Sequence, residues 1–519
     1  MGKIAISEIE FGKTDAYNEL QEVGAVFYMD SFLVHDRYKA ESFICGENYF
    51  ICGNKGTGKT AFLKYLECFF SRDPINLIIP IRFKSDFDDD DKKTIRAVGT
   101  NVKEEAIDEK TIGDTSSYVK AWQVYLVNQI ITKSESKEGE FYAFENTSEY
   151  KKMVILLNAL YSEQKERVIP KLSKGYAKIN ANSLKGIDAS LEFDIEFNEQ
   201  TSKINFQKTA RKILELFEQL RYARTPIKIL IDELELSVRN SKEYKRDIEL
   251  IRDLILAIDK LNHLFKKNDY RIQIIASIRS EVINHVLSQG YEINKCVEDF
   301  GVTVEWYQKG GSLDDHPLLK IIENKIHASE RAKGVEESAD IWSAYFSGMI
   351  NDSKIRPYIL SCTWYRPRDI IRMMRLVQDQ WKAEDVITQE MFDRALQGYS
   401  EKMWNEIAEE LTLCYSNIDD IKAIKKFFTG IQVPFTMNYL CERAKELSEI
   451  YPYVKAFFDR YKMIEFCEKM FEWGIIGNSG QRMVFSFLGD RELNPTADMI
   501  LHKPLRNYFA VTSRGKQRG

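Results

Sequence analysis

The glycine-rich stretch GNKGTGKT, residues 53–60, has the composition of a loop that binds phosphate groups. Its glycines let the backbone bend so that successive N–H groups point at phosphate oxygens, and a following helix adds its positive end. At this spacing we expect Lys59 to reach the β- and γ-phosphates of ATP and the Thr60 hydroxyl to bind Mg²⁺. The alternative is a glycine-rich strand-to-helix turn that binds no nucleotide. The predicted binding residues are Gly53, Asn54, Lys55, Gly56, Thr57, Gly58, Lys59, Thr60 and Ala61.

An acidic pair, Asp232 and Glu233, ends the apolar run in IKILIDELE, residues 227–235. We expect Asp232 to hold Mg²⁺ through water and Glu233 to act as the general base that polarises the attacking water. The alternative is a strand end followed by an acidic helix start, where carboxylates favour the helix dipole. An adjacent Asp-Glu pair favours a hydrolysing ATPase over a kinase or a small GTPase. The sequence has no N-K-x-D guanine motif and no LSGGQ signature.

A third set of polar residues follows the apolar run in YRIQIIASIRSEV, residues 270–282. Ser277 at this strand end is placed to touch the γ-phosphate or the lytic water. Arg279 would supply positive charge where negative charge develops during phosphoryl transfer. The alternative for Arg279 is a surface arginine at the start of a helix.

The elements that must position these residues alternate between strand and helix. Apolar runs with β-branched and aromatic residues predict strands at 47–52, 77–83, 227–231, 270–279 and 302–307. Apolar residues at helical spacing predict helices at 61–70 and 244–267. This alternation predicts an α/β fold with a parallel sheet and helices on both faces.

The motifs GNKGTGKT, ILIDELE, IIASIRSE and WYRPRDIIRMMR, in this order, resemble those of the AAA+ and STAND superfamily of P-loop ATPases. The sequence is most similar to the branch shared by origin-recognition proteins and bacterial P-loop ATPases encoded in anti-phage defence loci. The C-terminal pattern EWGIIGN…VFSFLGD…MILHKPLRNYF resembles the winged-helix module of these bacterial proteins. The resemblance implies an arginine at the start of a lid helix that points back at the phosphates, here Arg366 or Arg368. The alternative for both is a capped, solvated helix end.

The resemblance also implies the domain order. We expect an N-terminal segment at 1–46 that packs on the core and a P-loop ATPase core of the ASCE type at 47–310. A helical lid at 311–400, a winged-helix-like domain at 401–510 and a basic tail at 511–519 would follow. Within residues 26–38 the resemblance suggests contact with the adenine, with Phe32, Val34 and Asp36 as candidates. His502 is interpreted as a structural histidine, with an approach to the nucleotide as the alternative.

One departure from the family concerns the arginine finger that ring-forming members place before the last core strand. Residues 281–330 contain no arginine. Hydrolysis in trans by the usual finger is therefore in question. Arg239, Arg246 and Arg252 are possible substitutes.

The interval between Thr60 and Asp232 is far longer than one βαβ step, which needs ~30 residues. We therefore predict an insertion at about 84–205. It begins with the acidic run KSDFDDDDKK, interpreted as a solvated loop, and contains an expected helix at 117–131 with an apolar face at Val119, Trp122, Leu126 and Ile130. Alternation in SLEFDIEFNE, residues 190–199, predicts a half-buried strand.

Composition limits the function classes. The net charge of −5 gives no support for non-specific nucleic-acid binding. The eight cysteines form no C-x-x-C pair and predict buried thiols in a reducing cytoplasm. No apolar run approaches the ~20 residues of a membrane span, so we expect no membrane partner. Residues 401–519 carry 17 Lys plus Arg against 16 Asp plus Glu, so nucleic-acid binding there is possible and protein docking is its rival.

Two functions follow as expectations. The favoured one is a Mg²⁺-dependent ATPase that couples nucleotide state to assembly as a homo-oligomer. It would act in anti-phage defence, with a separate effector protein, since the sequence has no nuclease, deaminase or protease motif. The alternative is a nucleotide-gated scaffold or DNA-binding loader with little hydrolysis.

Overall fold

The computed structural model describes residues 3–86, 117–135, 143–161, 172–173, 176–178, 197–198, 203–234, 241–288, 293–307, 309–412, 414–415 and 417–513. The chain divides into two compact units. The sheet unit comprises Asp36–Lys55 and Lys59–Val304, and the helical unit comprises Met1–His35, Gly56–Gly58 and Glu305–Gly519. In the described part of the chain, no helix has both the length and the apolar composition needed to cross a bilayer.

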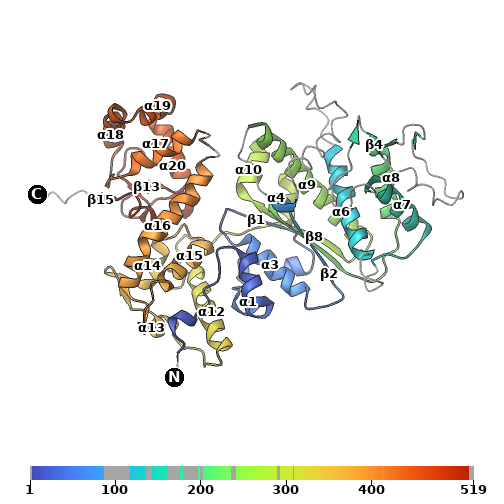
Figure 1. Cartoon of the computed structure of the whole chain (residues 1–519), viewed down its shortest axis with the longest axis horizontal. Coiled ribbons are helices and arrows are strands. Elements are labelled where there is room, and N and C mark those ends of the chain that lie inside the picture. Colours follow the sequence, from blue (N-terminus) through green and yellow to red (C-terminus); the bar gives the residue numbers. More distant parts are fainter. Residues whose placement is uncertain are drawn as a thin grey trace, which may run out of the picture. The chain divides into compact units, whose positions relative to one another are not determined.

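The sheet unit contains a five-stranded parallel sheet in the order β2-β7-β8-β1-β9 (Figure 1). The strands are β1 (Phe50–Gly53), β2 (Leu77–Arg82), β7 (Ile227–Leu234), β8 (Ile272–Arg279) and β9 (Gly301–Thr303). The predicted parallel sheet is therefore confirmed, although β9 is shorter than the expected strand at 302–307. The strand with the acidic pair is not adjacent to the strand before the glycine loop, because β8 lies between them.

The register aligns the polar strand ends. Gly53 at the end of β1 lies opposite Arg279 on β8, and Arg82 at the end of β2 lies opposite Asp232 on β7. The pairing of β7 with β8 shifts between Ile231 and Leu234, so the acidic pair occupies an irregularity of the strand. Because all five strands are parallel, their carboxyl ends share one edge of the sheet.

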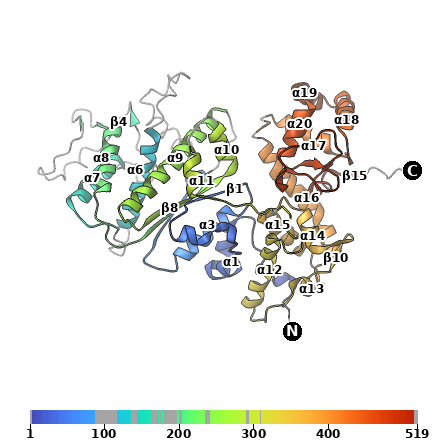
Figure 2. The same cartoon turned by 180° about the vertical axis from the view of Figure 1, so that it is seen from behind.

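Helices cover both faces of this sheet. Both views place α3 (Lys59–Phe70) on one side and α6 (Ser117–Glu135) and α9 (Ser241–Lys267) on the other (Figures 1 and 2). The expected helices at 61–70, 117–131 and 244–267 are thus confirmed. The remaining helices of the unit are α2 (Ala40–Ile44), α4 (Phe83–Asp86), α7 (Ser148–Tyr161), α8 (Phe206–Glu218), α10 (Ser280–Ser288) and α11 (Asn294–Phe300).

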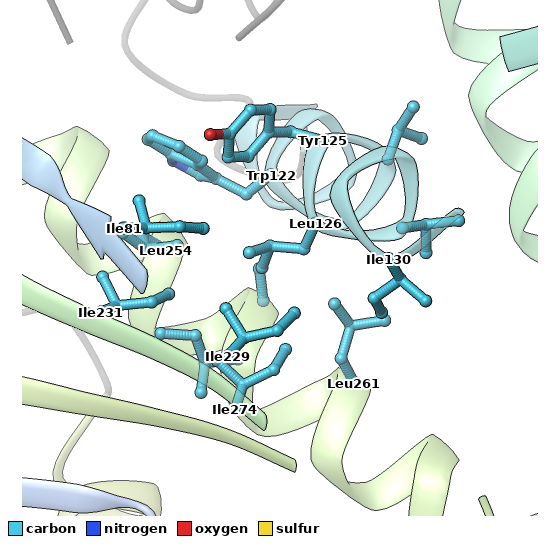
Figure 3. Packing of buried hydrophobic residues seen from close by; sticks show 14 of the residues in the cluster. Ile81, Trp122, Tyr125, Leu126, Ile130, Ile229, Ile231, Leu254, Leu261 and Ile274 are labelled. Carbon is cyan, nitrogen blue, oxygen red and sulfur yellow. The ribbon is translucent and has the colours of Figure 1, made fainter. Parts of the chain in front are cut away.

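The core of the sheet unit lies between α6, α9 and the sheet. Figure 3 shows Leu126 of α6 directed toward isoleucines of β7 and β8, such as Ile229 and Ile274, and Ile130 directed toward Leu261 of α9. The predicted apolar face of α6 is buried, and its opposite side is buried as well, at residues such as Val124 and Val127. This follows from the position of α6, which contacts α9, β2 and also α8. The Trp122 indole N–H donates to the Leu250 carbonyl at 3.1 Å, so the one polar atom of this side chain is satisfied.

The described part of the predicted insertion adds helices and a small antiparallel sheet. α7 packs on α8, and a four-stranded sheet has the order β3-β4-β6-β5. Its strands are β3 (Leu172–Ser173), β4 (Tyr176–Lys178), β5 (Phe197–Asn198) and β6 (Lys203–Asn205). Of the strand expected at 190–199, only Phe197 and Asn198 lie among the described residues, and Phe197 pairs with Ile204 of β6. Most of the acidic run at 84–93 lies outside them.

The helical unit joins the N-terminal segment to the region of the predicted lid. α1 (Ala16–Ser31) packs on α12 (Pro317–Ala332), where the buried carboxylate of Glu19 pairs with the ammonium of Lys325. Lys325 also donates to Ser31 Oγ at 3.0 Å. The following elements are α13 (Ile341–Tyr345), β10 (Met349–Ile350), β11 (Ser353–Lys354), α14 (Ile355–Ser361), α15 (Pro367–Gln378) and α16 (Gln389–Leu411).

The C-terminal part of the helical unit consists of short helices followed by paired strands. They are α17 (Ile418–Phe428), β12 (Gln432–Val433), α18 (Met437–Ile450), α19 (Pro452–Arg460), α20 (Met463–Glu472), β13 (Ile476–Asn478), β14 (Met499–Leu501) and β15 (Thr512–Ser513). β13 and β14 pair antiparallel. The winged-helix-like assignment stays a prediction, and the tail at 514–519 lies outside the described residues.

His502 is buried in an aromatic cluster of the helical unit. Its ring centroid lies 4.4 Å from that of Trp364, 4.7 Å from Phe487 and 5.1 Å from Phe485. Its Nδ1 atom has no hydrogen-bond partner among the described residues. Burial, with the nearby positive charges of Arg506 and Arg366, holds the pKa of His502 well below its usual value. These surroundings agree with a structural histidine that stays neutral.

Leu126→Ala should lower the free energy of unfolding of the sheet unit by ~2–5 kcal/mol, because it leaves a cavity between α6 and the sheet. Chemical denaturation followed by circular dichroism measures this change. Lys133→Ala, on an exposed position of the same helix, is the matched control and should stay within ~0.5 kcal/mol of the wild type. Equal stability of the two variants would contradict the packing of α6 described above.

His502 also predicts a pH dependence of stability. The unfolded chain binds a proton at this histidine near the ordinary pKa of ~6.5, whereas the folded chain does not, so stability should fall as the pH decreases below ~6.5. His502→Gln removes the imidazole that binds this proton in the unfolded chain. The thermal midpoint of the variant should therefore depend less on pH between ~5 and 7. Parallel pH profiles of the variant and the wild type would show that His502 is protonated in the folded state.

Candidate functional site

The glycine loop, residues 53–60, joins the end of β1 to the start of α3. The Lys59 ammonium donates to two carbonyls of the loop itself, Gly53 O and Asn54 O, each at 2.8 Å. The Lys59 side chain is buried, so these bonds satisfy a charge that would otherwise be costly to desolvate. A lysine that folds back over its own loop in this way keeps its charge at the end of the strand.

The start of α3 supplies backbone donors beside that charge. The helix begins at Lys59, so the positive end of its dipole lies at this residue. Thr60 and Ala61 lie in this turn and are half-buried. The helix dipole therefore adds partial positive charge next to the Lys59 ammonium, which together favour an anion.

Asp232 is held at the adjacent strand end by Ser277. The Ser277 hydroxyl on β8 donates to Asp232 Oδ1 on β7. Both side chains are buried, with 2% of Asp232 and 3% of Ser277 exposed. The hydrogen bond fixes the orientation of the carboxylate, and it links two residues that the sequence singled out for separate roles.

Glu233 has a backbone conformation that is uncommon for a non-glycine residue. Its φ is +60°, within the irregularity at the end of β7. This conformation costs of order 1 kcal/mol and turns the side chain out of the alternation of the strand. The Glu233 carboxylate accepts a hydrogen bond from Ser85 Oγ of α4 at 2.6 Å. The side chain is thus held at the sheet edge by a hydroxyl from α4, the short helix that follows β2.

Arg279 is the last residue of β8 and lies opposite Gly53 of β1 in the register. Its side chain is half-buried. Within the sheet unit, the carboxyl edge therefore gathers five of the predicted site residues: Gly53, Asp232, Glu233, Ser277 and Arg279.

The middle of the glycine loop, Gly56–Gly58, belongs to the helical unit. The Trp306 indole N–H donates to the Thr57 carbonyl at 2.9 Å. The backbone N–H of Arg368 faces the Gly56 carbonyl at 3.4 Å. A Cβ atom on Gly56 would lie 3.2 Å from Arg366 Cδ and 3.5 Å from Arg368 Cβ. Both predicted lid arginines therefore lie beside the tip of the loop.

The side chain of Arg368 is directed at a carboxylate of the same unit. Its Nη1 atom is 3.5 Å from Glu406 Oε1, and Arg372 bonds the other oxygen of Glu406. The buried Arg368 Nε atom has no hydrogen-bond partner among the described residues. Asp369 is fully buried in the next position, and burial raises its pKa to about 6. Arg368 is thus incompletely paired where it meets the glycine loop.

The residue before Arg366 has a strained backbone. Tyr365 has a φ of +54°, and its ring packs against the rings of Tyr307 at 5.2 Å and His316 at 5.1 Å. Pro367 occupies the first turn of α15, as expected from the sequence. The ring contacts hold a conformation that the backbone alone disfavours, and they fix the direction in which Arg366 leaves the turn.

The donor set fits a magnesium nucleotide. Hydroxyl and carboxylate oxygens, such as those of Thr60 and Asp232, are the ligands that Mg²⁺ prefers, and lysine with a helix N-terminus suits phosphate. Among the described residues, no group of three or more His, Cys, Asp or Glu side chains could hold a metal ion. Mg²⁺ usually keeps waters and phosphate oxygens as most of its ligands, so a fuller protein cage is not required.

Three contacts were missed by sequence reasoning: Ser85 on Glu233, Trp306 on Thr57 and Glu406 on Arg368. The sequence predicts Ser85 in the acidic loop, whereas the pairing of Arg82 with Asp232 brings it to the site. Of the proposed finger substitutes, Arg252 is buried and bonds Asp253 at 2.6 Å, so it cannot reach another subunit. Arg239 and the side chain of Arg246 lie outside the described residues.

Comparison with known proteins gives one family match. Residues 316–408 match the FunZ-associated C-terminal helical domain. This range contains α12 to most of α16 and overlaps the predicted lid at 311–400. A search of curated proteins found no match.

Proposed function

We propose that the protein is a Mg²⁺-dependent ATPase that couples its nucleotide state to assembly. The observation that carries the proposal is the hydrogen bond from Ser277 to Asp232. It lies at the sheet edge where the Lys59 ammonium donates to Gly53, the last residue of β1. A carboxylate, a hydroxyl and an ammonium at the carboxyl edge of one parallel sheet suit the chemistry of a metal-bound polyphosphate.

Binding would use groups that already carry the correct charge. Lys59 would exchange its two carbonyl partners for phosphate oxygens, which form stronger, charge-assisted hydrogen bonds. Thr60 and Asp232 would hold Mg²⁺, which when bound neutralises charge on the phosphates. Arg279 would contribute positive charge near the γ-phosphate. By the family resemblance, Arg368 or Arg366 would point back at the phosphates.

Hydrolysis would use Glu233 as the base. The carboxylate is half-buried, and among the described residues the Ser85 hydroxyl holds it. A neutral hydrogen bond contributes only ~1 kcal/mol net, so a water molecule can compete with Ser85 for this carboxylate. Glu233 would then accept the proton of the attacking water.

We extend the proposal to a biological role, which is based on resemblance to other proteins. The match to a FunZ-associated domain supports a place in anti-phage defence, because FunZ is associated with defence-type loci. We propose a cytoplasmic homo-oligomer that acts on a separate effector protein. The winged-helix-like region at 401–510 would dock that protein or nucleic acid.

A second candidate function is a nucleotide-gated scaffold or DNA-binding loader with little hydrolysis. The contact between Ser85 and Glu233 favours it, because it keeps the base occupied. The absence of arginine from residues 281–330 favours it as well. Phosphate release, measured with size-exclusion mass in the presence and absence of ATP, separates the two. Turnover with an ATP-dependent mass supports the ATPase, and a mass change without turnover supports the scaffold.

Glu233→Gln should keep ATP binding and reduce phosphate release by ~10²-fold or more, because an amide cannot accept the proton of water. Ser85→Ala is the matched control. It removes the partner of Glu233 but leaves the carboxylate, so the rate should change by less than about tenfold. Unchanged phosphate release in Glu233→Gln would remove Glu233 from the role of base.

Lys59→Ala should weaken ATP binding, because it deletes the ammonium aimed at the β- and γ-phosphates. Isothermal titration calorimetry with ATP and Mg²⁺ measures the affinity. Lys64→Ala, on the same helix, removes a lysine that is already paired with Glu67 and should bind ATP as the wild type does. Wild-type affinity in Lys59→Ala would count against nucleotide binding at the glycine loop.

A further inference from the structure

Two consecutive carbonyls at the tip of the glycine loop are held from outside the loop. The Thr57 carbonyl accepts from the Trp306 indole at 2.9 Å, and both residues are buried. The Gly56 carbonyl faces the Arg368 backbone N–H at 3.4 Å. All four residues belong to the helical unit, so the loop tip and its two donors form one packed group.

These contacts determine where the loop's own donors point. A trans peptide is planar, and its C=O and N–H groups point in opposite directions. A Thr57 carbonyl turned toward Trp306 therefore turns the Gly58 N–H away from Trp306. In the same way, a Gly56 carbonyl turned toward Arg368 turns the Thr57 N–H away from Arg368.

The glycines make this arrangement possible. Gly56 has a φ of +82° and Gly58 a φ of +94°, a region that residues with a Cβ atom rarely adopt. Gly56 also has little space for a Cβ atom, which would lie 3.2 Å from Arg366 Cδ. Adjacent backbone N–H groups that face the same concave side of a loop form a binding site for an anion.

We propose that Trp306 is a positioning residue for the phosphate-binding loop. By holding the Thr57 carbonyl, its indole N–H presets the Gly58 N–H toward the phosphates, before the nucleotide arrives. The ring is itself fixed, since it packs against His35 with centroids 5.6 Å apart. Preorganised donors bind an anion more tightly, because they need not be reoriented on binding. This inference rests on the proposed nucleotide site and adds a residue that the sequence motifs do not include.

The test is Trp306→Phe, which keeps an aromatic ring but removes the N–H donor. Calorimetric affinities for inorganic pyrophosphate and for ATP, each with Mg²⁺, should fall about fivefold or more, the effect of one neutral hydrogen bond. Trp342→Phe is the matched control. It removes an indole N–H that donates to Glu323 in the same unit, at 2.7 Å, and should bind both ligands as the wild type does.

The readout is specific for phosphate positioning because pyrophosphate has no base or sugar. A loss for both ligands, with an unchanged circular dichroism spectrum, supports the proposal. Wild-type affinity for pyrophosphate in Trp306→Phe overturns it. Lys59→Ala separates this failure from that of the proposed function: if Lys59→Ala loses binding and Trp306→Phe does not, the nucleotide site stands and the role of Trp306 is wrong.

If Trp306→Phe does not fold, wild-type protein labelled with 5-fluorotryptophan decides. The chain has 7 tryptophans, so the Trp306 resonance is assigned by exclusion from single Trp→Phe variants of the others. A single narrow Trp306 resonance in the ligand-free protein supports the proposal, because the ring is then already held in one position. Several or broadened Trp306 resonances that become one narrow resonance only when pyrophosphate and Mg²⁺ are added overturn it.

Discussion

The buried carboxylate of Asp232 is the constraint on which the sheet edge depends. Only 2% of the Asp232 side chain is exposed. Burial of its carboxylate without a hydrogen-bond donor would cost free energy, and Ser277 supplies a donor. This bond is possible only because β7 and β8 are parallel neighbours whose register brings the two residues together. The same strand, β8, aligns Arg279 with Gly53 at the start of the glycine loop. The position of each polar side chain at this edge therefore follows from strand pairing.

In the helical unit, backbone carbonyl groups of the glycine loop are likewise held by hydrogen-bond donors. Its buried polar atoms hold carbonyls of the loop tip, through Trp306 and Arg368, while the Arg368 guanidinium rests against Glu406. A phosphate beside the tip would be a second anion for the same guanidinium. If the proposed nucleotide binds, Glu406 and a phosphate would compete for one cation, and a ligand shifts an equilibrium only by its differential affinity for two states.

Periodicity and motif spacing predicted the regular elements well. The apolar runs gave the strands of the parallel sheet, and helical spacing gave α3, α6 and α9 with the faces that they bury. Contacts that depend on register could not be predicted in this way. Ser85 reaches Glu233 because β2 pairs with β7, and Trp306 reaches Thr57 although 249 residues separate them. The irregularity that gives Glu233 a φ of +60° leaves no mark in the composition of its strand.

The position of β8 between β1 and β7 has a consequence for how this sequence can vary. Ala276 lies opposite Phe50 on one neighbour and Ile231 on the other, and no part of its side chain is exposed. A larger residue there would push against the packing around both strands at once, so the spacing between the glycine loop and the acidic pair would change in a single step. The outer strand β9 pairs with β1 on one side, so its exchange would disturb a single strand pairing of this sheet. Substitutions should therefore be tolerated better on the outer strands of the sheet than on β8, its central strand.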